Sequence, residues 1–244
     1  VPLLPGIPRT RPRVNKLPLP GPPLLPLRLF ASRALAGANL AQLLVSPAAF
    51  GFQVMITLYL QRVLGYGAAA SGLGLLPTAA VIGTVALGLS ARIAARFGPR
   101  PMLLAGLGLI TAGLALLTLI PVHASYPTQI LPPLLIFGVG GGLCLPALAS
   151  LGMSGATPAD AGLASGLFNT TQQIGAALGV AVLSTLAAAQ TRSQHATGPN
   201  PAAALAAGYH LAFATAAALA GTAIVVAAVV LWPSRRRAAL AECC

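Results

Sequence analysis

The chain of 244 residues is 57% hydrophobic and only 7% charged, whereas soluble proteins are typically about 25% charged. Together with a mean hydropathy of +0.86, this composition excludes a soluble globule and indicates an integral membrane protein. The net charge of +12 is high enough for a nucleic-acid-binding protein. The basic residues cluster at the ends of apolar runs, however, where membrane topology requires them, so we expect no nucleic acid partner.

Both ends of the chain have compositions that do not suit a packed core. Residues 1–26 are rich in proline and arginine, a combination that cannot form a regular helix or bury apolar surface. We therefore expect a disordered cytoplasmic tail over residues 1–26 and a short basic cytoplasmic tail over residues 235–244.

Six apolar runs between these tails are long enough to cross a bilayer, since about 20 apolar residues span its hydrocarbon core of about 30 Å. Connections rich in glycine and proline separate the runs. The pattern predicts transmembrane helices over residues 35–60, 71–91, 102–120, 129–153, 161–188 and 209–232. The predicted fold is therefore an all-α membrane protein with one six-helix bundle over residues 27–234.

The first helix carries polar residues at spacings of three, four and seven positions, which place them close to one face. They are Asn39, Gln42, Ser46 and Gln53. Because a polar side chain that faces lipid is costly, we expect this face to look into the protein or into a water-filled cavity. Two interpretations remain open: these residues line a substrate pathway, or they join helices through hydrogen bonds.

The connection between the second and third helices holds the only charges between Arg62 and Asp160. Its arginines are flanked by glycines, and the set comprises Gly88, Arg92, Arg96, Gly98 and Arg100. A charged stretch within such a long apolar region must lie at a membrane surface.

The third and sixth runs are the most uniformly apolar, as expected of helices that face lipid. The fourth contains a glycine run over residues 138–142 followed by Pro146, which favours either a bend or close packing, with packing the simpler interpretation. In the fifth, small residues four positions apart permit close helix approach. The predicted helix interface of the fifth run comprises Gly162, Ser165, Gly166, Asn169 and Gln173.

Arginine and lysine residues predict the orientation, because cytoplasmic loops retain positive charge. With the N-terminus inside, twelve of these residues lie on the inner side, and only Arg62 and Arg192 lie outside. We therefore expect both termini to be cytoplasmic in a multi-pass protein of the cell membrane, such as the bacterial inner membrane.

Several segments resemble the major facilitator superfamily, and specifically the C-terminal six-helix half of its fourteen-helix multidrug drug:proton antiporters. The resemblance covers about residues 24–234. The segments that carry it are residues 25–33, 58–66, 71–77, 96–101 and 161–167, followed by Asn169, Gln173 and Gly175.

This resemblance implies a transporter, not an enzyme, that exports small hydrophobic or amphipathic compounds by proton antiport without a cofactor. It implies that the basic connection braces neighbouring helices on the cytoplasmic side. It also implies that the first and fourth helices line the central cavity, that the second and fifth meet the other half, and that the third and sixth face lipid.

Transporters of this kind are built from two halves, so we expect a missing N-terminal half to be the partner of this chain. The only acidic residues are Asp160, at the inner end of the fifth helix, and Glu242, in the tail. No carboxylate therefore lies within the predicted spans to couple proton movement. The alternative is a truncated half-bundle without transport activity of its own.

An enzyme reading rests on Gly152 and Ser154, which resemble the nucleophile motif of intramembrane serine proteases, together with His210. The predicted topology places Ser154 on the inner side and His210 on the outer side, about 30 Å apart, which excludes the hydrogen bond that such catalysis needs. The three cysteines have no metal-ligand spacing, so we expect no metal site.

Overall fold

The computed structural model describes residues 33–122, 124–154, 160–197 and 200–231, and every regular element within them is helical. The helices are α1 (Arg33–Arg62), α2 (Ala68–Thr84), α3 (Ser90–Phe97), α4 (Pro99–Leu117), α5 (Leu131–Met153), α6 (Ala161–Thr197) and α7 (Pro201–Leu231). Two π-helical turns, η2 (Val85–Leu89) and η3 (Tyr126–Ile130), join α2 to α3 and lead into α5. The two predicted tails lie outside the described residues.

Six helical spans of the described chain are long and apolar enough to cross a membrane. The predicted all-α fold with six spans is thus confirmed, while the cytoplasmic location of the termini stays a prediction. The fifth span continues to Thr197 and the sixth begins at Pro201, so both are longer than their apolar runs predict. A helix supplies its own backbone hydrogen bonds, so it does not need to end where the apolar residues end.

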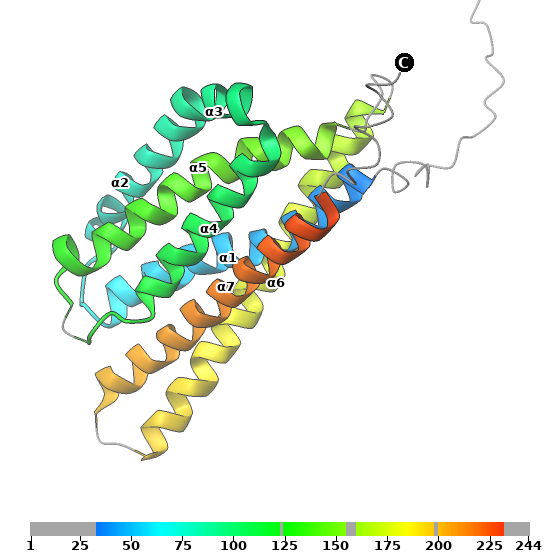
Figure 1. Ribbon diagram of the computed structural model, residues 1–244. Coiled ribbons are helices and arrows are strands. Elements are labelled where there is room, and N and C mark those ends of the chain that lie inside the picture. Colours follow the sequence, from blue (N-terminus) through cyan, green and yellow to red (C-terminus); the bar gives the residue numbers. More distant parts are fainter. Residues whose placement is uncertain (1–32, 123, 155–159, 198–199, 232–244) are drawn as a thin grey trace, which may run out of the picture.

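The six spans pack as two groups of three that make equivalent contacts. The first span, α1, packs against the fifth and sixth, α6 and α7, while the fourth, α5, packs against the second and third, α2 and α4. Contacts between α4 and α7 and between α1 and α5 join the two groups. Figure 1 shows α2, α4 and α5 gathered on one side of the bundle and α6 and α7 on the other.

Aromatic rings from α1, α5 and α7 pack together in the core, which also contains apolar side chains of α4. The ring of Phe52 lies 4.4 Å from that of Phe137 and 6.0 Å from that of Phe213, measured between centroids. Tyr59 meets Tyr209 edge to face at 5.9 Å. These spacings fall in the range in which aromatic pairs stabilise a core beyond their buried area.

The glycines of α5 serve close packing on two sides. A methyl group on Gly140 would lie 2.7 Å from the carbonyl oxygen of Gly106 on α4, and one on Gly142 would lie 2.7 Å from Cβ of Val85 in η2. Neither distance leaves room for a side chain. The glycine run therefore holds α5 directly against both neighbours, as the packing interpretation proposed.

The second and fifth spans are the least covered. Within their most apolar stretches only 6% and 22% of the residues are buried, against 61% in the fourth span. Large apolar side chains are exposed along both, namely Leu73, Leu76 and Leu87 on the second span and Ile174, Leu178 and Val182 on the fifth. Two apolar faces of the bundle are thus left open to lipid or to another protein.

Candidate functional site

The polar residues of α1 divide into a buried group and an exposed residue. Asn39, Gln42 and Ser46 are buried, with exposed fractions of 7%, 2% and 1%. Gln53 is exposed, although its spacing places it on the same face. Its backbone carbonyl accepts a hydrogen bond of 2.8 Å from the hydroxyl of Thr57.

The crossing of α6 over α1 explains this division. A methyl group on Gly175 of α6 would lie 2.9 Å from Cβ of Ser46, and one on Gly179 would lie 2.3 Å from Cα of Pro47. One turn later on α1, Gly51 meets Leu183. Along α1, the contacts with α6 therefore shift from Ser46 on the polar face to Pro47 and Gly51 on the neighbouring face. Gln53 lies past this crossing point, and α6 does not cover it.

The buried polar group is only partly hydrogen-bonded. The side-chain amide of Asn39 donates to the Leu35 carbonyl at 2.9 Å, and that of Gln42 donates to the Ser46 hydroxyl at 3.1 Å. The amide oxygens Asn39 Oδ1 and Gln42 Oε1 have no hydrogen-bond partner among the described residues. A buried acceptor without a donor is costly, so a donor from water or from a ligand is favoured at each of these oxygens.

Of the two glycine pairs on α6, only the second is covered in this chain. Gly175 and Gly179 meet α1, whereas methyl groups on Gly162 and Gly166 would have no atom within 4 Å. The whole predicted interface is exposed: Gly162, Ser165, Gly166, Asn169 and Gln173. That this surface is a helix interface stays a prediction.

The basic connection between the second and third spans is mostly helix and not an extended loop. Arg92 and Arg96 are exposed on α3, four residues apart and therefore on one side, and Gly98 forms the turn into α4 with φ of 84°. The guanidinium of Arg96 lies 5.4 Å from the centre of the Phe97 ring, a cation–π distance. Gly88, in η2, and Arg100, near the start of α4, are also exposed.

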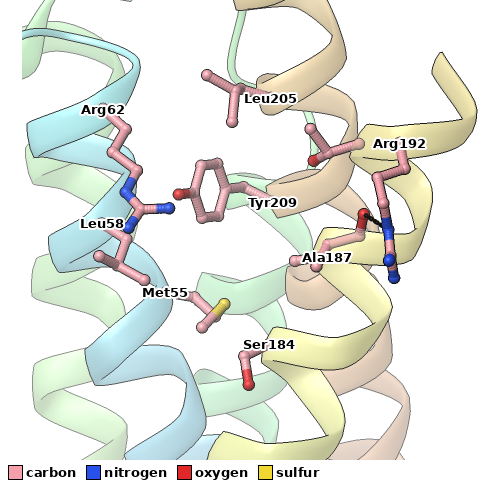
Figure 2. Close-up of a pocket in the computed structure, with 10 residues that line it drawn as sticks. Met55, Leu58, Arg62, Ser184, Ala187, Arg192, Leu205 and Tyr209 are labelled. Carbon is pink, nitrogen blue, oxygen red and sulfur yellow. Dashed lines mark hydrogen bonds between the residues drawn. The ribbon is translucent and has the colours of Figure 1, made fainter. Parts of the chain in front are cut away.

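A cavity of about 580 Å³ lies at the other end of the bundle, between α1, α6 and α7. Figure 2 shows Arg62 on α1 and Arg192 on α6 at its two sides, with Tyr209 of α7 between them. The Tyr209 hydroxyl points toward the Arg62 guanidinium. The remaining lining residues are Met55, Leu58, Ser184, Ala187, Ala188, Thr191 and Leu205.

Sequence reasoning did not single out this cavity. Arg62 and Arg192 entered only as the two outer charges in the topology count, and Tyr209 only as the start of a helix. Their meeting depends on the packing of α1, α6 and α7, which no short motif encodes. One feature of the sequence could have pointed to it: Arg62 and Arg192 are the only lysine or arginine residues that the predicted topology places outside.

The protease arrangement is absent from this fold. His210 lies in α7, near the backbone of Ile120, which precedes η3. Ser154 follows the opposite end of α5 and donates to the Leu151 carbonyl at 2.8 Å. The 28 residues from Tyr126 to Met153 lie between these two ends, about 42 Å of helix. Within the described chain no group of three His, Cys, Asp or Glu residues is placed to hold a metal ion.

Comparisons with known proteins identify the family. The model described as Major Facilitator Superfamily matches residues 1–180. The cephamycin export protein CmcT of Amycolatopsis lactamdurans is 38% identical over 69% of this chain and 35% of its own length. The puromycin resistance protein pur8 of Streptomyces alboniger is 32% identical over 86% of this chain and 42% of its own length.

A solved structure has the same fold at low sequence identity. It is a bacterial homologue of the human drug peptide transporters PepT1 and PepT2, with a TM-score of 0.66 and 18% identity. The match covers 81% of this chain and 41% of that protein. The chain therefore spans less than half the length of each of these relatives.

Proposed function

Because this chain belongs to the major facilitator superfamily, we propose that it is the C-terminal six-helix half of a fourteen-helix drug:proton antiporter. The full-length protein would export small hydrophobic or amphipathic compounds across the cell membrane. Relatives named as export or antibiotic resistance proteins support this substrate class. Membership of a transporter family also places the chain among transporters and not among enzymes.

The observation that carries the proposal is the pair of uncovered apolar faces on the second and fifth spans. Ile174 and Leu178 on α6 are more than half exposed, as are Leu73 and Leu76 on α2. The second half of the transporter is the occupant that suits these faces. With the second half in place, the predicted interface on α6, which includes Gly166 and Asn169, would lie between the two halves. Its small residues would let the helix backbones approach closely.

The polar residues of α1 supply the proposed substrate pathway. Gln53 is exposed on the same side of the helix as the buried Asn39, Gln42 and Ser46, so it provides an amide where the wall is open. The unpaired oxygens of Asn39 and Gln42 provide acceptors deeper in the wall. Uncharged amides beside apolar side chains suit a hydrophobic or amphipathic compound better than an inorganic ion.

The arginines on α3 are proposed to brace the inner side of the bundle. Arg92 and Arg96 project from the exposed side of an eight-residue helix at the end of the second span. In that position they can contact anionic lipid headgroups or the carbonyl ends of neighbouring helices.

One feature favours a second candidate, a half-bundle without transport of its own. Asp160 is the only carboxylate side chain in the described part of the chain, and it lies just before α6 begins. Proton coupling through an embedded carboxylate therefore has to use the other half.

Expression in an efflux-deficient bacterial host separates the two candidates. Ethidium accumulation is measured for the chain alone and for the chain fused behind the N-terminal half of the related puromycin resistance protein. We expect lower accumulation only with the fusion, and we expect a protonophore to abolish the difference.

Immunoblots of the membrane fraction provide the control for equal amounts of protein. Lower accumulation with the chain alone would contradict its assignment as one half of a transporter. Accumulation equal to the empty vector in both cases, with both proteins in the membrane, would contradict drug export.

A further inference from the structure

The cavity between α1, α6 and α7 is lined by two arginines and by apolar side chains. Arg62 comes from the last turn of α1 and Arg192 from α6, so two separate helices each contribute an arginine to the lining. Met55, Leu58 and Leu205 give the same space an apolar lining. A volume of about 580 Å³ lies within the usual range for small-molecule sites, about 300–1,000 Å³.

No carboxylate in the described part of the chain can neutralise these arginines. The only one, Asp160, precedes α6, whereas Arg192 lies 32 residues later, about 48 Å along the helix. Two positive charges at one cavity without a carboxylate raise its affinity for an anion.

The Arg62 side chain reaches across the cavity, whereas the Arg192 side chain lies along its own helix. The Arg62 guanidinium points across the space toward the Tyr209 hydroxyl. Nε of Arg192 donates to the Ala188 carbonyl at 3.3 Å. Tyr209 is itself packed edge to face on Tyr59, which fixes its ring.

We propose that this cavity binds an amphipathic anion, with a phosphate, sulfonate or carboxylate head between Arg62 and Arg192 and an apolar body against Met55, Leu58 and Leu205. The Tyr209 hydroxyl donates a third hydrogen bond to the head. Guanidinium groups suit this role because their planar donors match the oxygens of such anions. The site is independent of the proposed pathway on α1 and does not require transport.

Octyl phosphate is a suitable probe, with the full chain reconstituted in nanodiscs of neutral phosphatidylcholine and with empty nanodiscs as background. We expect saturable binding that weakens with added salt, since screening reduces the attraction between charges. Arg62→Gln and Arg192→Gln should each weaken binding about ten-fold or more, because each removes a charged hydrogen-bond donor. Tyr209→Phe should weaken it only a few-fold.

Arg235→Gln is the matched control, because it removes the same charge from the sequence that follows α7. Circular dichroism of each variant verifies that helix content is retained. Absence of saturable binding to the unmodified chain would overturn the proposal. So would equal binding of octyltrimethylammonium, which carries the opposite charge, or unchanged binding by the Arg62→Gln, Arg192→Gln double variant.

A second arm of the experiment identifies the source of the anion. If nanodiscs containing phosphatidylglycerol suppress octyl phosphate binding to the unmodified chain, the natural occupant is an anionic phospholipid headgroup. If binding is unchanged in these nanodiscs, the cavity selects a soluble amphiphile. Both results agree with an anion site, and loss of the arginine dependence in either lipid would refute it.

Discussion

Substituting Gly179 by alanine tests whether the contact between α1 and α6 organises this bundle. The new methyl carbon would lie 2.3 Å from Cα of Pro47 and 2.6 Å from its carbonyl oxygen. Carbon atoms in contact are normally about 3.5–4.0 Å apart, so the helices must separate by about 1 Å or more at this point. The clashing atoms belong to the backbone, which cannot rotate away as a side chain can.

Two opposing effects set the size of the expected change. Overpacking of a core costs about 1–3 kcal/mol, and a clash with backbone belongs at the upper end of that range. Alanine favours a helix over glycine by about 1 kcal/mol. The net expectation for Gly179→Ala is a loss of about 2 kcal/mol in the free energy of unfolding.

The same helix offers a matched control at Gly166, where a methyl group would meet no atom within 4 Å. Gly166→Ala should stabilise the isolated chain by up to about 1 kcal/mol, because only the helix preference changes. Equilibrium unfolding of the full chain in mixed micelles of increasing SDS content, followed by far-ultraviolet circular dichroism, measures both variants. Equal stabilities of the two variants, or a more stable Gly179→Ala protein, would refute the reasoning.

Three further expectations concern α1 and the membrane orientation. In the fusion protein, Asn39→Leu and Gln42→Leu should lower drug export while leaving the amount of protein in the membrane unchanged; parallel loss of both would instead favour a helix-joining role. Tyr59→Phe removes a 3.2 Å hydrogen bond to the segment before η3 and should reduce the free energy of unfolding by about 1 kcal/mol, and no change would show that this bond does not stabilise the fold. In a cysteine-free background, a membrane-impermeant maleimide should label Arg62→Cys in intact cells and Arg96→Cys only after permeabilisation, whereas the reverse pattern would contradict the predicted topology.

Hydropathy was sufficient to predict the six spans, because a bilayer imposes one length scale on every helix that crosses it. The same criterion missed α3. Its arginines read as a surface connection, yet alanines at positions 91, 94 and 95 let the helix of the second span continue to Phe97. Charge near a membrane surface predicts where a segment lies, and it does not predict whether the backbone stays helical.

The candidate site depended on how helices cross, which spacing along one helix cannot reveal. Gln53 and Ser46 share a face by sequence, but α6 covers only the second of them. Likewise the two glycine pairs of α6 look alike in sequence, and only Gly175 and Gly179 meet a helix of this chain. The close contact is set by Pro47 on the partner helix, so the information resides in the pair of helices and not in the motif.

The turn at Gly98 has a mechanical consequence for the second and third spans. Only this residue separates the end of α3 at Phe97 from the start of α4 at Pro99. The two Cα atoms are therefore no more than about 7 Å apart in any conformation of the chain. Because the connection is this short, a displacement of the second span at this end also displaces the adjoining end of the third span. Any change in the angle between the two spans at this end has to occur at Gly98, which is held at a positive φ.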